Sequence, residues 1–340
     1  MQRVGASELT VPTLGLGTGP LGGMKASVND AQSDSVLDQA WVSGIRFFDT
    51  APWYGTTQSE HRLGRYLRNK PRDEFVVTTK VGRVFKRPDR GFDFERSQWR
   101  ERWPGGLPFV PHFDYSAGPI LRSWEDSLQR LGLPRVDGLA IHDLDPRHRK
   151  TDAGVDGGFR QLDQEGGFAA LQDLKRSGEI AAIGAGINLP GLIPRFLEHF
   201  DIDYFVLAMP YTLLDQQALA EELPLCEARG ASVIIGAPFA SGILATGTTA
   251  EATYQYKRAD EPVRERVRAI ETVCDAFDVP IAAAALQFPV AHPAVVSVIP
   301  GADTANHVQA NVAAFGIEIP SELWAALKEK GLIAADAPVP

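Results

Sequence analysis

Four side chains in this sequence have the types that a proton-transfer site needs. Asp49 ends the segment RFFD, and Tyr54 follows it five residues later. Lys80 ends the segment FVVTTK, and His142 ends the segment LAIH. Asp49, Lys80 and His142 therefore each stand where a short, mostly apolar run stops, which is where a buried strand is expected to end.

Together these residues could turn a phenol into a base. A free tyrosine has a pKa of about 10, which is too high for a good base at neutral pH. A neighbouring ammonium favours the phenolate and lowers that pKa. Lowering it by about three corresponds to roughly 4 kcal/mol, the order that one close cation supplies in a partly desolvated site. Lys80 would be that cation, Asp49 would keep it charged and in place, and His142 would hydrogen-bond the reacting oxygen.

Each of these residues also has an ordinary structural explanation. An aspartate at a strand end is often a cap or an ion-pair partner, and a lysine there is usually exposed. A tyrosine or a histidine at the rim of a fold is commonly a packing residue. The placement of three of the four at the ends of consecutive strands favours catalysis over these separate explanations.

Short apolar runs that alternate with helix-period segments must position these residues. Most of the runs are apolar throughout, which is typical of strands buried on both faces of a parallel sheet. The runs predicted as strands are residues 14–16, 45–48, 75–79, 138–141, 181–187, 204–209, 232–235 and 295–299. The helices predicted between them are residues 33–42, 59–68, 119–131, 168–177, 192–199, 216–229, 262–277 and 304–315.

This alternation predicts an α/β fold, a (β/α)8 TIM barrel over residues 1–340 as a single domain. A doubly wound open sheet is the alternative, and the absence of a G-x-G-x-x-G segment between the first strand and a helix weakens it. Residues 1–11 predict an N-terminal hairpin, and residues 280–288 and 321–330 predict two extra helices. Residues 331–340 form a C-terminal tail.

A long segment after the third strand, residues 82–118, shows no clear period and is rich in aromatic residues. A loop of this length in a compact domain is usually functional. In a barrel it would emerge at the carboxyl ends of the strands, where barrel active sites lie. A loop packed on its own aromatic core is an equally good and compatible interpretation.

Composition excludes several classes of protein. The net charge of −9 argues against nucleic-acid binding, and we interpret the basic run 147–150 as a solvated loop. The two cysteines, Cys226 and Cys274, form no disulfide framework, which favours a cytoplasmic protein. There is no signal-peptide pattern and no apolar run long enough to span a membrane. We expect a monomer or a small homo-oligomer that acts on a small molecule.

The sequence resembles the aldo-keto reductase superfamily over nearly its whole length. The matching segments are LTVPTLGLGTGPLGG, FFDTAPWYG, SEHRLGRYL, VVTTKVGR, SLQRLGLPRVDGLAIHD, LKRSGEIAAIG, and VIPGA followed by Asn311. Within the superfamily, the long third loop, RSWEDSLQRLG, IHDLD and YTLLDQ are similar to the aldose 1-dehydrogenase branch. That branch includes D-threo-aldose (L-fucose type) and L-galactose dehydrogenases and pyridoxal 4-dehydrogenase.

The resemblance implies that Asp49, Tyr54, Lys80 and His142 form the family's catalytic tetrad, in the roles given above. It implies a nicotinamide cofactor, with Asn188 on the carboxamide, residues 238–244 around the pyrophosphate, and residues 301–311 around the adenosine. It also implies that Trp53 walls the substrate pocket. Separately, His112 and Asp114 are polar residues on the long loop and could reach the hydroxyl groups of a sugar substrate. The implied cofactor residues are Gly17, Thr18, Asn188, Pro238, Phe239, Ser241, Gly242, Leu244, Gly301, Asp303, Thr304, His307 and Asn311.

The residues expected around the adenosine end of the cofactor favour NAD over NADP, with NADP as the alternative. Relatives that prefer NADP place a lysine or arginine at the 2′-phosphate, whereas this sequence has Gly301, Asp303 and His307. Asp303 would repel a phosphate and could accept a hydrogen bond from a ribose hydroxyl. Alternatively, Asp303 is the N-cap of the helix that begins near Thr304.

The resemblance and the cofactor preference together predict an NAD(P)-dependent oxidoreductase that oxidises an aldose of the L-fucose or L-galactose type at C1 to the lactone. Tyr54 would be the general base. Pyridoxal oxidation and a broad NADPH-dependent carbonyl reductase are the alternatives within the fold. An alternative from another class of enzyme is a metal-dependent hydrolase, with His142, Asp143, Asp145 and His148 as the metal ligands. It is disfavoured, because Lys80 would repel the cation and the sequence has no second histidine cluster at a strand end. We therefore expect no metal. A cofactor-sensing module without turnover is the last alternative.

Overall fold

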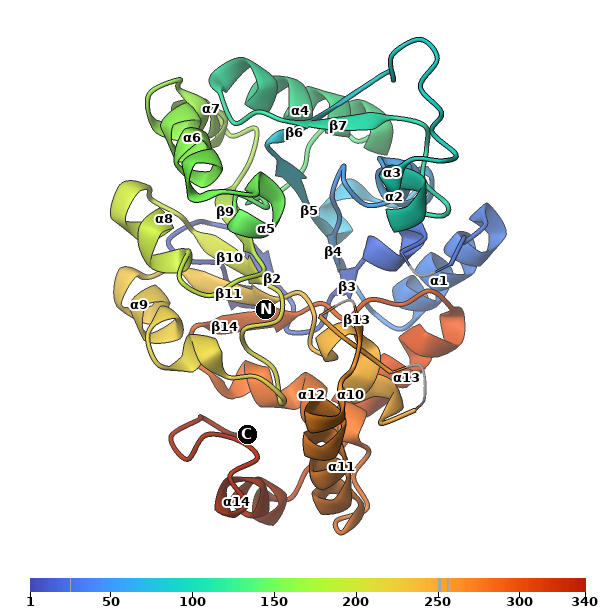
Figure 1. The fold of residues 1–340 in the computed structure, drawn as a ribbon, viewed down its shortest axis with the longest axis vertical. Coiled ribbons are helices and arrows are strands. Elements are labelled where there is room, and N and C mark those ends of the chain that lie inside the picture. Colours follow the sequence, from blue (N-terminus) through green and yellow to red (C-terminus); the bar gives the residue numbers. More distant parts are fainter. Residues whose placement is uncertain (25, 250–251, 256) are drawn as a thin grey trace.

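A closed parallel sheet forms the centre of the molecule. The structure, a computed structural model, describes residues 1–24, 26–249, 252–255 and 257–340. All neighbouring strands of the sheet run parallel, and bridges from Leu14 to Val298 and from Gly17 to Gly301 join its two ends. The (β/α)8 barrel that the sequence predicts is therefore confirmed (Figure 1). Its strands are β3 (Leu16–Gly17), β4 (Phe47–Asp49), β5 (Val76–Val81), β8 (Gly138–His142), β9 (Ala182–Ile187), β10 (Tyr204–Leu207), β11 (Ser232–Ile235) and β14 (Val295–Val298).

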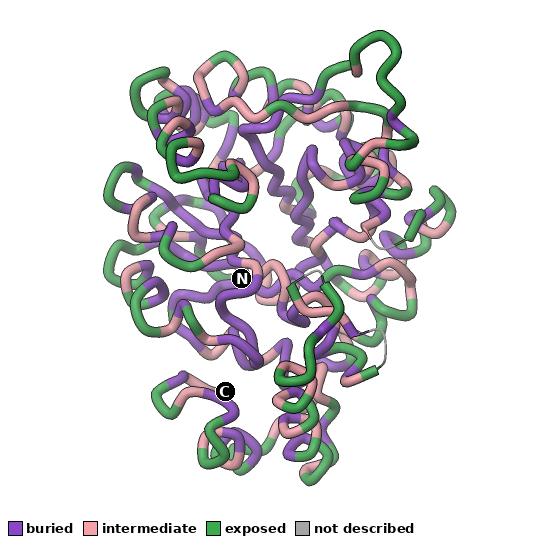
Figure 2. Tube along the Cα trace, viewed as in Figure 1, coloured by how far each residue is buried: buried purple, intermediate pink, exposed green. Residues whose placement is uncertain are grey.

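The strands are buried on both faces, as their continuous apolar character indicates (Figure 2). In β10, Tyr204 and Val206 join the cluster that fills the barrel, whereas Phe205 and Leu207 join the larger cluster between the sheet and the helices. Side chains alternate across a strand, so a two-sided core needs apolar residues at successive positions.

Helices surround the sheet at nearly all the predicted places (Figure 1). Local chemistry sets their ends: Asn29 accepts a hydrogen bond from the Gln32 amide at the start of α1, and Gly132 ends α4 with a φ of 61°. The longer helices are α1 (Asp30–Val42), α2 (Gln58–Leu67), α4 (Ala117–Leu131), α6 (Asp152–Asp163), α7 (Gly167–Arg176), α8 (Ile193–His199), α9 (Glu222–Arg229), α11 (Glu261–Asp275), α12 (Ile281–Gln287), α13 (Ala305–Phe315) and α14 (Ser321–Glu329). The short ones are α3 (Gln98–Arg102), α5 (Pro146–Arg149) and α10 (Ile243–Thr246).

The predicted N-terminal hairpin is present and closes one end of the barrel. Strands β1 (Gln2–Arg3) and β2 (Thr10–Val11) pair antiparallel, and Val4, Leu9 and Val11 pack into the cluster inside the barrel. The Gly5 amide donates to Ser232 Oγ at 2.7 Å, which ties the hairpin to β11. This end is therefore plugged, and only the carboxyl ends of the strands are left for a site.

The segment after β5 carries its own secondary structure. Strands β6 (Arg83–Lys86) and β7 (Val110–Phe113) form an antiparallel pair, and helix α3 lies in the stretch between them. Gly82 has a φ of 94°, and a Cβ there would lie 2.2 Å from the Tyr115 ring, so the turn that aims β6 requires glycine. A further hairpin, β12 (Thr253–Tyr254) with β13 (Lys257–Arg258), follows α10.

Two sequence-based interpretations were wrong. The basic run 147–150 is not a loop, because residues 146–149 form α5, capped by the Asp145 carboxylate on the His148 amide at 2.9 Å. The helix predicted over residues 216–229 is broken into a 3-10 turn (Gln217–Leu219) and α9. Among the described residues, no helix combines the length and the apolar character needed to cross a bilayer.

Candidate active site

The carboxyl ends of three neighbouring strands bring the candidate catalytic residues together. Asp49 is the last residue of β4, Lys80 lies near the end of β5, and His142 is the last residue of β8. These strands are adjacent in the sheet, and Lys80 pairs in register with Ala140, two residues before His142. Their side chains can therefore meet at one mouth of the barrel.

Lys80 is an ammonium fixed by two oxygens. Its Nζ donates to Asp49 Oδ1 at 2.5 Å and to the Thr50 carbonyl at 2.8 Å, while Asp49 Oδ2 accepts from Thr78 Oγ1 at 2.8 Å. Burial acts to lower the pKa of Lys80, but the charge of Asp49 and the interactions with Asp49 and Tyr54 outweigh it, so that the pKa is raised. Lys80 is consequently charged at neutral pH in a site where its side chain is 2% exposed.

Tyr54 lies between the ammonium and the imidazole. Lys80 Nζ is 4.9 Å from the centroid of the Tyr54 ring, and a hydrogen bond with Tyr54 is among the causes that raise the Lys80 pKa. The ring centroids of Tyr54 and His142 are 6.1 Å apart, with the planes at 90°. A tight turn follows, in which Thr56 and Thr57 have φ values of 46° and 86°. Such strained backbone next to a half-buried tyrosine is typical of functional sites.

His142 is buried and neutral. Burial, the largest influence, and the nearby cations lower its pKa well below the ordinary value, although Asp143 opposes the shift. Its Nδ1 is buried and has no hydrogen-bond partner among the described residues. Because Nδ1 is enclosed by protein, a hydrogen bond from the neutral imidazole to a reacting oxygen would have to be made by Nε2, and it stays a prediction.

The residues proposed for metal binding in the hydrolase alternative do come together, but a cation already lies among them. One ligand atom from each of Asp143, Asp145 and His148 lies within 4.8 Å of the others. Arg83 forms an ion pair with Asp143, and His148 Nδ1 lies 2.8 Å from Asp145 Oδ1. Each carboxylate thus has a charged or hydrogen-bonding partner within the protein, although Asp145 Oδ2 has none among the described residues, and the arrangement fits an internal ion-pair network better than a metal centre.

Two glycines allow the backbone at the ends of β3 and β14 to pack closely. A Cβ at Gly17 would lie 2.8 Å from the Ile299 carbonyl oxygen, and one at Gly301 would lie 2.8 Å from Pro20 Cγ. Thr18 is fully buried, and its hydroxyl donates to the Asp49 carbonyl at 3.0 Å. Thr18 thus connects the glycine-rich end of β3 to the strand that carries Asp49.

The turn predicted to hold a pyrophosphate has an unusual backbone. Ala240, Ser241 and Gly242 have φ values of 47°, 68° and 112°, directly before α10. Thr253 Oγ1, from the β12–β13 hairpin, donates to the Ser241 carbonyl at 2.8 Å. The Ala240 and Gly242 amides donate to the carbonyls of Ala237 and Phe239 at 2.9 and 2.8 Å, so the turn is closed by its own backbone and phosphate binding there stays a prediction.

Asp303 is paired with His307 and does not cap α13. Thr304 Oγ1 accepts from the His307 amide at 3.2 Å, which makes Thr304 the N-cap. Asp303 Oδ1 lies 2.6 Å from His307 Nδ1, and the Asp303 carbonyl accepts from Gln32 Nε2 at 2.7 Å. The capping explanation for Asp303 is therefore excluded, and its carboxylate stays at the exposed start of the helix.

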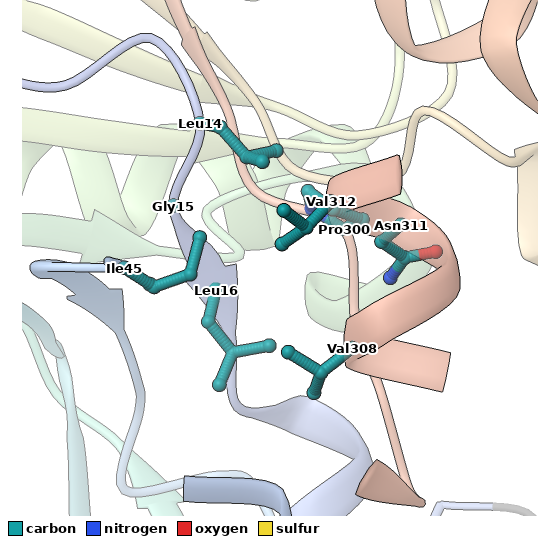
Figure 3. Close-up of a pocket in the computed structure, with 8 residues that line it drawn as sticks. All are labelled: Leu14, Gly15, Leu16, Ile45, Pro300, Val308, Asn311 and Val312. Atoms are coloured by element: carbon teal, nitrogen blue, oxygen red, sulfur yellow. The ribbon is translucent and has the colours of Figure 1, made fainter. Parts of the chain in front are cut away.

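Asn311 lies one turn further along α13, beside a small apolar hollow between that helix and the start of β3 (Figure 3). The volume of the hollow is about 10 Å³, which is no more than a single water molecule needs. The hollow is therefore a packing gap and not a ligand site. Its lining residues are Leu14, Gly15, Leu16, Ile45, Pro300, Val308, Asn311 and Val312.

Tryptophans form the wall beside Tyr54. Trp53 packs edge-on against Trp99 and Trp103, with ring centroids 5.7 and 5.6 Å away, and Trp103 lies 6.0 Å from Tyr54. Trp99 and Trp103 come from the long segment after β5, and Trp103 is fully buried. Sequence reasoning named Trp53 but not Trp103, and only the richness of this segment in aromatic residues could have indicated it.

The other two predicted substrate residues lie in less suitable places. His112 is exposed on β7, where it pairs in register with Val84. The Asp114 carboxylate accepts from both the amide and the hydroxyl of Ser116, at 3.1 and 2.7 Å. Asp114 thus shapes the entry to α4. Contacts between the substrate and these two residues stay a prediction with no support from the geometry.

Comparisons with known proteins agree with this arrangement. A protein-family model, described as Aldo/keto reductase family, matches residues 13–331 of the sequence. Pyridoxal 4-dehydrogenase of Microbacterium luteolum is 40% identical over 98% of this chain and 97% of its own length. D-threo-aldose 1-dehydrogenase of a Pseudomonas species is 35% identical over 96% of each chain, and L-galactose dehydrogenase of Arabidopsis thaliana is 29% identical over 92% of this chain and 87% of its own.

A solved structure shares the fold. The holo form of an aldo-keto reductase from Bacillus halodurans superposes with a TM-score of 0.76 at 24% identity, over 99% of this chain and 97% of that one. A glycerol dehydrogenase from Gluconobacter oxydans gives a TM-score of 0.72 at 22% identity, over 99% and 96%. At these identities the likeness concerns the barrel and its added elements.

Proposed function

The chain belongs to the aldo/keto reductase family and is an NAD(P)-dependent oxidoreductase, and from that premise we propose that it oxidises a cyclic hemiacetal to a lactone. The proposed substrate is an aldose of the L-fucose or L-galactose type, oxidised at C1. In water, such sugars and pyridoxal alike exist largely as cyclic hemiacetals. The relatives named for pyridoxal, D-threo-aldose and L-galactose therefore share one reacting group, a carbon that carries a hydroxyl and a ring oxygen.

The observation that carries the proposal is the fixed Lys80 ammonium beside Tyr54. Lys80 is charged and bound to Asp49, and the interaction with Tyr54 that helps to raise the Lys80 pKa also favours the phenolate form of Tyr54. Tyr54 then takes the proton of the hemiacetal hydroxyl, while the neutral His142 hydrogen-bonds the same oxygen. The bound nicotinamide supplies the hydride acceptor, so that the C1–H bond breaks as C1=O forms.

NAD is the proposed cofactor. The Asp303 carboxylate lies at the start of α13, where an adenosine 2′-phosphate would meet a like charge, and His307 is its partner. A ribose hydroxyl, in contrast, could donate to this carboxylate. Asn188 and residues 238–244 are the proposed contacts for the rest of the dinucleotide, as membership of the family implies. NADP binding is the competing outcome.

Pyridoxal is a second candidate substrate, supported by a separate observation. Trp53 and the partly exposed Trp99 form an aromatic wall next to Tyr54, and a flat pyridine ring can pack on such a wall. The pyridoxal 4-dehydrogenase relative at 40% identity adds to this candidate. The same wall also suits the apolar face of a sugar ring, so both substrates belong in one test.

The test measures the appearance of reduced cofactor with L-fucose, L-galactose and pyridoxal, each with NAD and with NADP. We expect turnover of at least one hemiacetal, with NAD giving the higher kcat/KM. The Tyr54→Phe variant should lose at least about 10³-fold in kcat, since it removes the base, and should bind NAD as the wild-type protein does in a tryptophan-quenching titration. Retained activity in Tyr54→Phe would refute the proposed base, and no turnover with any substrate would refute the hemiacetal proposal.

A further inference from the structure

Asp143 directly follows His142 and has an unusual conformation. Its φ is 50°, in the left-handed region that few residues other than glycine adopt, although aspartate and asparagine tolerate it. The residue is 3% exposed. A buried carboxylate in strained backbone, adjacent to a candidate catalytic residue, needs a compensating role.

Four groups from four different parts of the chain lie against the Asp143 carboxylate. Asn188 Nδ2, just beyond the end of β9, donates to Oδ1 at 2.8 Å. His142 Nε2 lies 3.3 Å from Oδ2, and Arg83, at the start of β6, pairs with the same oxygen. His148 Nε2, on α5, is 3.6 Å from Oδ2. One carboxylate therefore touches both the residue proposed for the nicotinamide carboxamide and the residue proposed for the reacting oxygen.

Arg83 keeps this carboxylate charged and immobile. Its guanidinium is 2% exposed and is stacked between Trp53 and Phe113, 4.4 and 4.5 Å from their ring centroids. Burial acts to raise the pKa of Asp143, but the neighbouring groups, Arg83 among them, outweigh it and the pKa is lowered. The ion pair is thus built into the aromatic wall of the site and does not depend on solvent.

We propose that Asp143 is a positioning residue that fixes the Asn188 amide and the His142 imidazole relative to each other, and thereby sets the nicotinamide carboxamide against the reacting oxygen of the substrate. The inference rests on the proposed function, which gives Asn188 and His142 their contacts. Hydride transfer is sensitive to such placement, since a displacement of about 1 Å can cost about 10²-fold in rate. A purely structural carboxylate would affect folding stability without affecting the reaction.

The principal variant is Asp143→Asn, which preserves size and the tolerance of positive φ but removes the charge that Arg83 holds. With the hemiacetal that the wild-type protein oxidises fastest among L-fucose, L-galactose and pyridoxal, kcat/KM should fall by about 10²-fold. The primary isotope effect with substrate deuterated at the reacting carbon should rise, because hydride transfer becomes slower. The matched control, Asp173→Asn, removes an exposed carboxylate on α7 that pairs with Arg176, and should match the wild-type protein.

A second, independent test asks whether substitutions at Asp143 and Asn188 have additive effects on NAD affinity. Asn188→Ala should weaken NAD binding by about 10-fold in the wild-type background but by less than about 3-fold in the Asp143→Asn background, because residues in one network are not additive. If Asp143→Asn does not fold, Arg83→Lys replaces it. That variant keeps the charge but loses the guanidinium fork, and should lower kcat/KM about 10-fold.

The outcomes separate the two proposals. If the wild-type protein oxidises none of the three hemiacetals, both the proposed function and the role of Asp143 are wrong. If it oxidises one, and Asp143→Asn matches Asp173→Asn in kcat/KM and isotope effect, only the positioning role is overturned. An unchanged Arg83→Lys variant, where Asp143→Asn fails to fold, overturns it as well. A loss of kcat/KM together with non-additive NAD affinities supports it.

Discussion

The Lys80 ammonium donates to Asp49 at 2.5 Å, and both side chains are 2% exposed. Removing one member of an ion pair so far from water typically costs about 3–5 kcal/mol, because the other charge is left buried without its counter-ion. The pair thus does two things at once. It joins β4 to β5 at the mouth of the barrel, and it presents a fixed positive charge to Tyr54.

The first prediction concerns Lys80→Met. Without the ammonium, the pKa of Tyr54 should return towards the free value of about 10, so that less phenolate is present at pH 7 and kcat/KM should fall by at least about 10²-fold. The base must be deprotonated for oxidation, so a higher pKa moves the rising limb of the pH–rate profile to higher pH. Profiles of kcat/KM between pH 6 and pH 10 for both proteins check this.

Because Lys80→Met also leaves the Asp49 charge buried and alone, a stability control is needed. The double variant Asp49→Asn with Lys80→Met removes both charges and should regain most of the lost unfolding free energy in urea. It should nevertheless keep the displaced pH profile. A double variant with the wild-type profile would show that Lys80 does not set the pKa of Tyr54.

The second prediction concerns cofactor choice at α13. Asp303→Ser combined with His307→Arg removes a negative charge and adds a cation where the 2′-phosphate would lie. A hydrogen bond to a charged group is worth on the order of 1.5–3 kcal/mol, and each change should favour NADP over NAD by about that much. The ratio of kcat/KM for NADP over NAD should therefore rise by about 10²-fold or more. Steady-state kinetics with both cofactors measure this ratio. Glu322→Gln, an exposed position on α14, is the control, and an equal ratio in all three proteins would contradict the assignment.

Much of this arrangement could be read from the sequence because its signals are local. Apolar runs that stop at a polar residue locate the ends of β4, β5 and β8, and the topology of a parallel barrel then brings Asp49, Lys80 and His142 to the same mouth. The position of Tyr54 beyond β4 follows from the same argument, since a short turn cannot carry it far from the strand end.

The remaining features depend on information that a single sequence does not display. Helix α6 was not predicted, because Gly154, Gly157 and Gly158 have low helix propensity and interrupt the apolar periodicity of the segment. Its stability comes from tertiary packing, which the sequence does not display. The contact between Asp143 and Asn188 depends on a left-handed backbone angle that aspartate adopts only in a particular tertiary setting. Trp103 reaches Tyr54 through the folding of the long segment after β5, whose path has no periodic signal.

The third prediction concerns Trp103. Its indole packs against Trp53 and Tyr54, and the Leu107 amide donates to the Gly55 carbonyl at 3.0 Å, which holds the segment over the site. Trp103→Ala should lower kcat/KM for the hemiacetal by about 10- to 100-fold, because loss of this buried indole lets Trp53 and Tyr54 shift, and a displacement of about 1 Å can cost about 10²-fold in rate. NAD affinity should stay within about twofold. A parallel loss of NAD affinity would mean that Trp103 supports the whole site and not the substrate wall.

The fourth prediction concerns stability in mild acid. Burial lowers the pKa of His142 and His292 in the folded protein, whereas in the unfolded chain a histidine titrates near 6.5. As pH falls below about 6.5, the unfolded state takes up protons that the folded state does not, so stability must decrease with decreasing pH. Each such histidine contributes a slope of up to about 1.4 kcal/mol per pH unit.

His292→Gln tests this away from the candidate site. His292 Nδ1 accepts from the Ala294 amide at 3.2 Å, and a glutamine oxygen can replace that acceptor without titrating. Urea unfolding at pH 7.5 and pH 5.5 should therefore show a smaller loss of unfolding free energy for the variant than for the wild-type protein, with similar values at the higher pH. An equal loss in both proteins would mean that His292 takes up its proton in the folded state as readily as in the unfolded one.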